Sequence, residues 1–439
     1  MTKILSTIGP VSEGRQLNYL IKNSEIVRLN MSHNSIEWHS QVIEKIKKFD
    51  KKKLILIDIP GVKPRTKNEN KIKINKGQKI NFKYTNQNYN GIKISNPLPK
   101  LKKNIKKFSL SDGSHTFKLT KSENNFIQGI SEQNFILNSG KGLNIPMSIY
   151  DDQLQEKKYL KFLKKISLLD YDCIGLSFIQ NSKIILKLKK LYPNKLFISK
   201  IENYLGYKNR ISIIRESDAI MVDRGDLSAE VGISKLSEYT DRIIQDTKNI
   251  GKPVIIATEN LNSLIYETSP SKSDVVNLDN YISKNVDYLM LSDETATSKN
   301  WKNTIHWLST YLKKKIKNFK SKPLTIEEIS KNLQHQNVVL FSKKGFFFDK
   351  IANLELKNLL VFTENNRLIK LLKLKKNSES IYIKFPKKHL HEFLFKSIKK
   401  YKKLVFKKDK FAYLINVIFP RKNSRANSIS IIEEKDFIK

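Results

Sequence analysis

The chain has 439 residues, of which 39% are hydrophobic, and its formal net charge is +40. This length exceeds that of one typical core, so two or three domains are expected, and the sequence contains neither a membrane-length apolar run nor a signal-peptide pattern, which predicts a soluble, cytoplasmic protein. The single cysteine, Cys173, lies inside an apolar run and excludes an internal disulfide or a cysteine-based zinc site.

Eight short apolar runs alternate with amphipathic stretches over the first three hundred residues. The helix-like stretches include Ser35 to Phe49, Ser182 to Leu191 and Ser237 to Asn249, where apolar residues recur at three- and four-residue spacing. The expected strands are Lys3 to Ile8, Glu25 to Asn30, Leu54 to Ile59, Cys173 to Phe178, Leu196 to Glu202, Ala219 to Asp223, Pro253 to Thr258 and Tyr288 to Ser292. Eight such units predict an α/β fold of the (β/α)8 TIM barrel type, built from residues 1–66 and 143–320.

About a hundred residues separate the third strand from the fourth, and this interval breaks the rhythm. Residues 67–142 are predicted to form short alternating strands with Gly and Asn turns, among them Lys71 to Ile74, Lys79 to Tyr84 and Thr116 to Thr120. We expect a small inserted β-barrel domain after strand three. At the active-site rim it would act as a hinged lid that excludes water.

Residues 321–439 alternate predicted strands with basic helices and are expected to form a C-terminal α/β domain. Ile305 to Phe319 is predicted to be the last barrel helix, and Ser321 to Pro323 marks the boundary. The expected strands are Val338 to Phe341, Leu359 to Phe362, Ile381 to Lys384 and Phe411 to Phe419.

Polar and charged residues stand where the barrel strands end, which is where barrel enzymes carry their active sites. They are Arg28, Asn30, Ser32 and His33; Asp58, Lys63 and Arg65; Lys200 and Glu202; Gly225 and Asp226; Thr258; and Ser292 and Glu294. Strand four, ending in Ser177 and Phe178, is expected to add little. A carboxylate pair beside the Lys200 ammonium suits one Mg²⁺ ion and a phosphorylated substrate, because Mg²⁺ prefers hard oxygen ligands and phosphate.

At these strand ends the chain resembles the pyruvate kinase family. The matching motifs follow the family order, span nearly the whole chain, and are Thr2 to Pro10, Arg28 to His33, Lys141 to Pro146, Ile198 to Asn203, Met221 to Leu227, Lys252 to Thr258, Met290 to Thr295, Val339 to Gly345 and Phe419 to Ile429. The resemblance implies transfer of the phosphoryl group of phosphoenolpyruvate to ADP, which gives pyruvate and ATP. It also implies a homotetramer.

The resemblance assigns roles to the phosphoryl-transfer residues. Glu202 and Asp226 would hold Mg²⁺, and the backbone N–H groups of Gly225 and Asp226 would bind the substrate carboxylate at a helix start. Lys200 and Arg28 would be catalytic, and Arg28 would also bind substrate, because both neutralise charge on the transferring phosphoryl group.

Further roles concern the enolate, the nucleotide and a monovalent ion. Thr258 lies where the family keeps a hydroxyl near the carbon that gains a proton, and it would also bind substrate. His33, Arg65 and Lys141 would face the nucleotide.

Asn30, Ser32, Asp58 and the carbonyl of Ile59 would form a K⁺ site in many members. Here Lys63 occupies the position where potassium-requiring members carry glutamate. We therefore expect a need for Mg²⁺ and little need for K⁺.

Departures from the family pattern cluster near the site. Pro60, Val62 and Pro64 replace other residues beside Arg65, and the new prolines fix backbone angles there. Asp223 stands in place of alanine and adds a carboxylate beside the magnesium ligands, with an expected repulsion toward anionic substrate on the order of 1 kcal/mol. Further replacements are Glu259, Asn260 and Asp293, and Ser111 to Gly113 loses one acid of a paired motif.

Three other functions remain open at this point. A weakened barrel could bind phosphoenolpyruvate or nucleotide without efficient turnover, or a different barrel enzyme could act on enolates with Mg²⁺. A basic protein that binds RNA or another polyanion is the third, but the lysines are scattered along the whole chain, which favours a solvated surface over a nucleic-acid groove. The loop Ser342 to Gly345 could bind a sugar phosphate or be a plain strand-to-helix connection.

Overall fold

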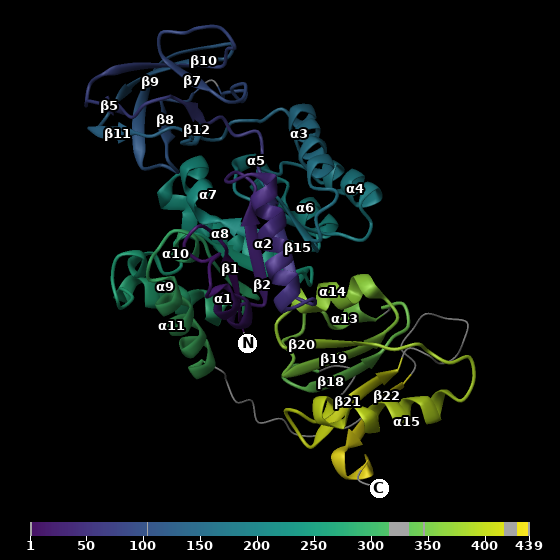
Figure 1. The fold of residues 1–439 in the computed structure, drawn as a ribbon. Coiled ribbons are helices and arrows are strands. Elements are labelled where there is room, and N and C mark those ends of the chain that lie inside the picture. Colours follow the sequence, from purple (N-terminus) through teal and green to yellow (C-terminus); the bar gives the residue numbers. More distant parts are fainter. Residues whose placement is uncertain (1, 103, 316–332, 346, 417–427, 438–439) are drawn as a thin grey trace. The chain divides into compact units, whose positions relative to one another are not determined.

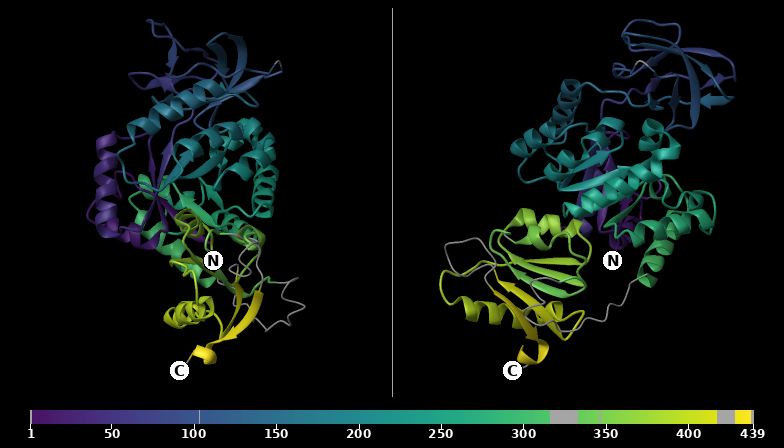
Figure 2. Two further views of the ribbon diagram at one scale, coloured as in Figure 1. Left: turned by 90° about the vertical axis from the view of Figure 1, so that its right-hand side faces the viewer. Right: turned by 180° about the vertical axis from the view of Figure 1, so that it is seen from behind.

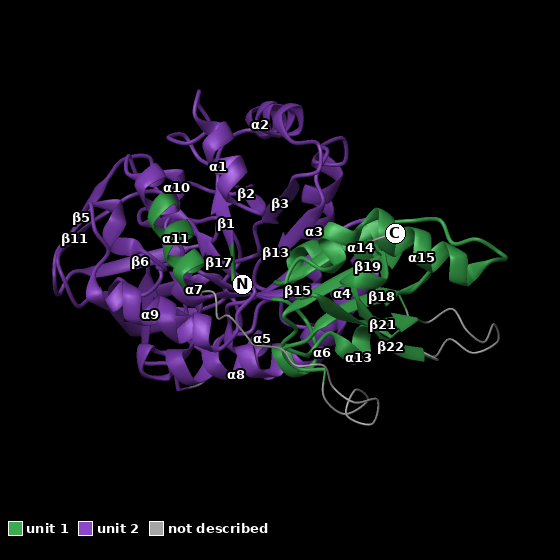
Figure 3. Cartoon of the chain, turned by 90° about the horizontal axis from the view of Figure 1, so that it is seen from below, with its two compact units in different colours: residues 1–3, 248–253, 306–439 green, residues 4–247, 254–305 purple. Residues whose placement is uncertain are grey.

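The structure is a computed structural model that describes residues 2–102, 104–315, 333–345, 347–416 and 428–437 (Figure 1). The chain divides into two compact units (Figure 3). One contains residues 4–247 and 254–305, and the other contains residues 1–3, 248–253 and 306–439. None of the described helices is long and apolar enough to cross a membrane.

Eight parallel strands close into a barrel, as the sequence predicts. They are β1 (Lys3–Thr7), β2 (Ile26–Asn30), β3 (Leu54–Ile59), β13 (Cys173–Leu176), β14 (Leu196–Ile201), β15 (Ala219–Asp223), β16 (Val254–Ala257) and β17 (Tyr288–Leu291). Their residues are almost all buried, as expected for parallel strands that are covered on both faces. The register pairs Asn30 with Asp58, so polar groups that end neighbouring strands share one rim.

Helices follow the barrel strands and lie outside them (Figure 2). They are α1 (Leu17–Asn23), α2 (Ile36–Phe49), α3 (Asp152–Lys165), α4 (Ser182–Leu191), α5 (Tyr204–Lys208), α6 (Arg210–Glu216), α7 (Arg224–Val231), α8 (Leu236–Asn249), α9 (Lys272–Ser283), α10 (Asp293–Ala296) and α11 (Trp301–Lys314), with 3₁₀ turns η1 (Ile233–Lys235) and η2 (Asn262–Ile265). Side-chain caps fix several helix starts: Ser35 accepts the N–H of Trp38, and Asp151 accepts those of Gln153 and Leu154. These caps set where each helix leaves the loop above its strand.

The insert between β3 and β13 is all-β, as expected (blue in Figure 1). A seven-stranded sheet has the order β12-β8-β9-β10-β6-β7-β4, and β11 pairs with β5. The strands are β4 (Thr66–Lys67), β5 (Ile72–Ile74), β6 (Lys79–Lys83), β7 (Ile92–Ile94), β8 (Lys107–Leu110), β9 (His115–Glu123), β10 (Phe126–Ser131), β11 (Phe135–Leu137) and β12 (Leu143–Asn144). Phe82, Phe108 and Phe117 pack in its core, with Phe108 and Phe117 stacked at 5.0 Å. Its strands β4 and β12 adjoin the points where the chain leaves and re-enters the barrel.

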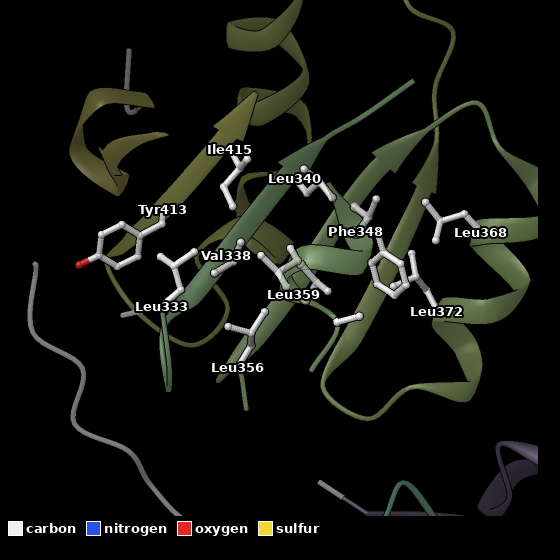
Figure 4. Close-up of a cluster of buried hydrophobic side chains, with 13 residues drawn as sticks. Leu333, Val338, Leu340, Phe348, Leu356, Leu359, Leu368, Leu372, Tyr413 and Ile415 are labelled. Atoms are coloured by element: carbon white, nitrogen blue, oxygen red, sulfur yellow. The ribbon is translucent and has the colours of Figure 1, made fainter. Parts of the chain in front are cut away.

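The C-terminal domain is a five-stranded sheet of order β20-β19-β18-β21-β22 in which only β22 is antiparallel among the described strands. The strands are β18 (Asn337–Phe341), β19 (Asn358–Thr363), β20 (Ser378–Tyr382), β21 (Phe411–Asn416) and β22 (Ser428–Glu433), and the helices are α13 (Phe348–Ile351), α14 (Asn366–Leu374), α15 (Leu390–Lys400), α16 (Lys402–Val405) and η3 (Glu434–Phe437). Alternate residues of the strands point to opposite faces of the sheet and pack into one hydrophobic core on each face. Figure 4 shows the core that contains Leu340 and Leu359.

Several boundaries differ from those predicted. Helix α11 begins at Trp301 rather than Ile305, because Trp301 and Thr304 already belong to the buried face that continues with Ile305. The expected end at Phe319 lies outside the described residues. Strand β20 begins three residues before Ile381. The expected boundary Ser321 to Pro323 and most of the motif from Phe419 also lie outside the described residues.

Candidate active site

Arg28, from the middle of β2, holds the carboxylate of Asp58 at the end of β3. Its Nε donates to Asp58 Oδ2 at 2.9 Å, its Nη2 lies 2.8 Å from the same oxygen, and its Nη1 donates to Thr7 Oγ1 at 3.0 Å. Burial alone would raise the pKa of Asp58, but Lys200 and Arg28 hold this pKa below its ordinary value. Arg28 is therefore a fixed, buried cation at the strand-end rim.

Lys200 lies at the centre of three carboxylates. Its Nζ is 3.4 Å from Asp58 Oδ2, 3.1 Å from Glu202 Oε2 and 3.2 Å from Asp223 Oδ2. Burial alone would lower the pKa of Lys200, but these three carboxylates hold it well above its ordinary value. The ammonium is thus charged and immobilised where β14 ends.

Strand four contributes more than expected, so that prediction was wrong. Ser177 Oγ donates to Asp58 Oδ1 at 3.1 Å and lies 3.4 Å from Lys200 Nζ. The N–H of Phe178, a residue with φ of 61°, donates to Glu202 Oε1 at 2.7 Å. The sequence gives no sign of these two contacts, because an uncharged serine and a backbone amide at a strand end do not stand out from their neighbours.

Glu202, Asp223 and Asp226 bring one ligand atom each to within 4.8 Å of one another. Burial and the neighbouring carboxylates raise the pKa of Glu202 despite Lys200, and burial together with Asp112 and Asp223 raises that of Asp226 to about 6 despite Lys63. Carboxylates this close repel one another unless a cation joins them. Their hard oxygens fit a divalent ion such as Mg²⁺.

Lys63 joins the insert to the barrel, and this contact was not foreseen. Its Nζ donates to Asp112 Oδ1 of the insert at 2.9 Å and to Asp226 Oδ1 of the barrel, and Asn144 Nδ2 donates to the same Asp226 oxygen at 3.2 Å. Burial alone would lower the pKa of Lys63, but Asp226 and Asp112 raise it, while Lys63 outweighs burial and lowers that of Asp112 to about 2. In the sequence, Lys63 lies 49 positions from Asp112 and 163 positions from Asp226, so this one side chain links distant segments.

The start of α7 lies against Thr258. The Gly225 N–H donates to Thr258 Oγ1 at 3.0 Å, Thr258 Oγ1 lies 2.7 Å from Ala257 O, and Arg224 donates to Thr258 O. Thr258 has φ of 63°, a strained conformation for a β-branched residue that the Arg224 contacts hold in place. A hydroxyl and a helix-start amide therefore face one another here.

His33, Arg65 and Lys141 share one electrostatic neighbourhood. Burial lowers the pKa of His33, Arg65, Arg28 and Lys141 lower it further, and Asp293 opposes them. Arg65 also donates from Nη1 to Gly140 O at 3.1 Å. The structure thus brings together cationic groups from β2, from the loop after β3 and from the end of the insert.

The expected monovalent-ion residues already have partners. Asp58 Oδ2 faces Arg28 and Lys200, and Asn30 Oδ1 accepts the Ser32 N–H at 3.1 Å. The carbonyl of Ile59 accepts the Ser177 N–H at 3.4 Å. The charge of Asp58 is therefore matched by protein cations.

A family model described as "Pyruvate kinase, barrel domain" matches residues 1–305. The pyruvate kinase of Thermococcus litoralis is 33% identical over 318 residues, which cover 68% of this chain and 66% of that protein. The pyruvate kinase of Pyrobaculum aerophilum is 25% identical over 410 residues, covering 87% of this chain and 88% of that protein. A crystal structure of pyruvate kinase from Pyrobaculum aerophilum has a TM-score of 0.76 with 21% identity over 98% of both chains, which shows a common fold.

Proposed function

The chain belongs to the pyruvate kinase family and has that family's function, and from this premise we propose how its own residues carry the reaction. The phosphoryl group of phosphoenolpyruvate passes to ADP, giving pyruvate and ATP. Lys200 and Arg28 neutralise the charge that spreads over the phosphoryl oxygens in a loose transition state. The positions of the two cations support this role. Both are buried and held by carboxylates, so they need little reorganisation when negative charge develops on the phosphoryl group.

Glu202 and Asp226 would hold the divalent ion, which would supply positive charge for the phosphoryl group during its transfer. The backbone N–H groups at Gly225 and Asp226 bind the substrate carboxylate at the start of α7. Thr258, whose Oγ1 lies beside Gly225 N, orients that carboxylate and lies near the carbon that is protonated when the enolate becomes pyruvate.

His33, Arg65 and Lys141 bind the phosphates of ADP. The lowered pKa of His33 keeps its imidazole neutral near pH 7, so the positive charge comes from Arg65 and Lys141.

Two features reduce the need for K⁺. The Lys63 ammonium supplies a fixed positive charge at Asp226, and the carboxylate of Asp58 is paired with Arg28 and Lys200. We expect stimulation by K⁺ to stay below tenfold.

We further propose that the active form is a cytoplasmic homotetramer, which is the assembly that family membership implies. Light scattering on the purified protein tests the assembly, and a monomer would contradict it.

The position of Lys200 among Asp58, Glu202 and Asp223 carries the proposal. Pyruvate formation from phosphoenolpyruvate and ADP with Mg²⁺, with and without K⁺, tests it for the wild type, Lys200→Met and a control, Lys284→Met. Lys284 pairs with Asp241 in a partly exposed ion pair, so its loss should leave activity within twofold. We expect Lys200→Met to lose at least a hundredfold in kcat. Retained activity in a folded Lys200→Met variant, or none in the folded wild type, would overturn the assignment.

A further inference from the structure

Asp223 is the carboxylate that the family pattern does not account for. It ends β15, is buried, and directs Oδ2 to Lys200 Nζ at 3.2 Å. It also brings an oxygen to within 4.8 Å of ligand atoms of Glu202 and Asp226. Asp223 is therefore part of the same cluster as the two proposed metal ligands.

The charges around this cluster do not balance. The ion pairs of Lys200 and Arg28 join two cations to three carboxylates, Asp58, Glu202 and Asp223. Those of Lys63 join one cation to two carboxylates, Asp112 and Asp226. Each of these groups has one more negative than positive charge, and they meet at Glu202, Asp223 and Asp226. One divalent cation there would neutralise the surplus.

Glu202 gives an independent indication of a missing ligand. Its Oε1 accepts the Phe178 N–H at 2.7 Å, but among the described residues Oε2 has no hydrogen-bond partner, although the Lys200 ammonium lies 3.1 Å away. The side chain is fully buried. Buried carboxylate oxygens normally have a hydrogen bond or a coordinated cation.

We propose that Asp223 is a third carboxylate ligand of the divalent cation, so that the substrate-free protein binds the ion by itself. This inference rests on the proposed function of the same site. Two carboxylates commonly hold Mg²⁺ together with substrate phosphates, and affinity for hard cations rises with the number of charged ligands. A third carboxylate therefore shifts the ion from a site shared with substrate to one that protein side chains complete largely by themselves.

The competing interpretation is that Asp223 serves only as a counter-ion for Lys200. Removing it would then weaken divalent-cation binding by less than about tenfold, because a nearby negative charge is lost but no coordinating oxygen is. The two interpretations predict different metal affinities in the absence of any substrate.

The experiment is equilibrium binding of Mn²⁺ to the full-length, substrate-free protein, with free Mn²⁺ followed by electron paramagnetic resonance. The variants are Asp223→Ala, Asp223→Asn, which preserves volume, and a matched control, Asp293→Ala. Asp293 is also a carboxylate absent from the family pattern, but it interacts with His33 and is not part of the cluster of Glu202, Asp223 and Asp226. Circular dichroism and thermal melting establish that each variant is folded.

We expect both Asp223 variants to weaken Mn²⁺ binding at least tenfold, the control to remain within twofold, and Mg²⁺ to displace Mn²⁺ from the wild type. Binding that is weakened less than tenfold in a folded Asp223 variant, tighter binding, or no binding by the wild type at millimolar Mn²⁺ would overturn the inference. Pyruvate formation by the wild type is scored separately. An active wild type whose Mn²⁺ affinity does not depend on Asp223 refutes only this inference, whereas an inactive wild type with Asp223-dependent binding refutes only the proposed function.

Discussion

Replacing Lys63 by methionine tests the bridge between the insert and the barrel. The ammonium is almost fully buried, and its loss leaves Asp226 without its cation. Removing one partner of a buried ion pair costs about 3 to 5 kcal/mol. The Asp112 side chain is 58% exposed and can turn to water, whereas that of Asp226 is 14% exposed, so the cost falls mainly on Asp226. We expect a loss of about 3 kcal/mol in the free energy of unfolding, the lower end of that range.

Divalent ions should reverse much of this loss. A ligand at a hundred times its dissociation constant stabilises the folded state by about 2.7 kcal/mol. Because Mg²⁺ and Lys63 both neutralise Asp226, Mg²⁺ should stabilise Lys63→Met more than the wild type. Denaturant unfolding followed by circular dichroism, with Mg²⁺ or with EDTA, measures both effects, and Lys284→Met is the control. If Lys63→Met unfolds within 1 kcal/mol of the wild type in EDTA, or if Mg²⁺ stabilises both proteins equally, the bridge lacks the assigned role.

Three further predictions concern the hydroxyl, a buried acid and a tight backbone contact. Thr258→Ala should lower the rate of deuterium exchange into the pyruvate methyl group about a hundredfold, while Thr258→Ser retains the hydroxyl and most of the rate, as followed by NMR; equal rates in the two variants would exclude the hydroxyl. Burial raises the pKa of Glu230 to about 8 despite the hydrogen bond from Tyr150, so its stabilising contribution is full below the unfolded pKa near 4.5 and is lost as pH rises toward 8. The stability of the wild type relative to Glu230→Gln should therefore fall by on the order of 4 kcal/mol between pH 4.5 and 8.5 in urea unfolding, and a constant difference would refute this. Gly9→Ala should destabilise by about 1 to 3 kcal/mol, because its Cβ would lie 2.3 Å from Ala296 O, whereas Gly14→Ala meets nothing within 4 Å and serves as the control in thermal melts.

The barrel could be predicted because its information is local. Buried parallel strands are continuous apolar runs, and runs such as Leu54–Ile59 and Leu196–Ile201 carry their charged residues at or just beyond the end. The strand-end rule then brings Arg28, Lys200 and Glu202 together without further information. The all-β nature of the insert followed in the same way from short alternating runs between turns.

The contacts that organise the site could not be predicted in this way. Lys63 meets Asp112 and Asp226 only because the insert brings its turn at Ser111 to Gly113 over the start of α7, and no pattern in one sequence encodes that approach. Ser177 was expected to add little, yet it links Asp58 to Lys200. The predicted helix ends at Phe49, Leu191 and Asn249 agree with the structure, whereas the start of α11 was placed four residues too late.

Lys63 and Asp223 compensate for one another in charge, and this makes a coupled prediction. Relative to a potassium-requiring member, lysine in place of glutamate at position 63 adds two positive charges, the proposed absence of K⁺ would remove one, and Asp223 in place of alanine removes another. The local charge thus stays as it is in a potassium-requiring site. Lys63→Glu alone should therefore be nearly inactive, because it adds a carboxylate beside Asp112 and Asp226 and removes their cation.

Adding Asp223→Ala to Lys63→Glu should recover activity and create stimulation by K⁺ of tenfold or more. The kcat/KM for phosphoenolpyruvate of the wild type, both single variants and the double variant, each with and without K⁺, forms the required cycle. Residues that share a charge cluster couple by about 0.5 to 3 kcal/mol, whereas independent sites add within about 0.5 kcal/mol. Additive effects in K⁺ would mean that the two substitutions act separately, and Asp223 would then have to be explained by metal binding alone.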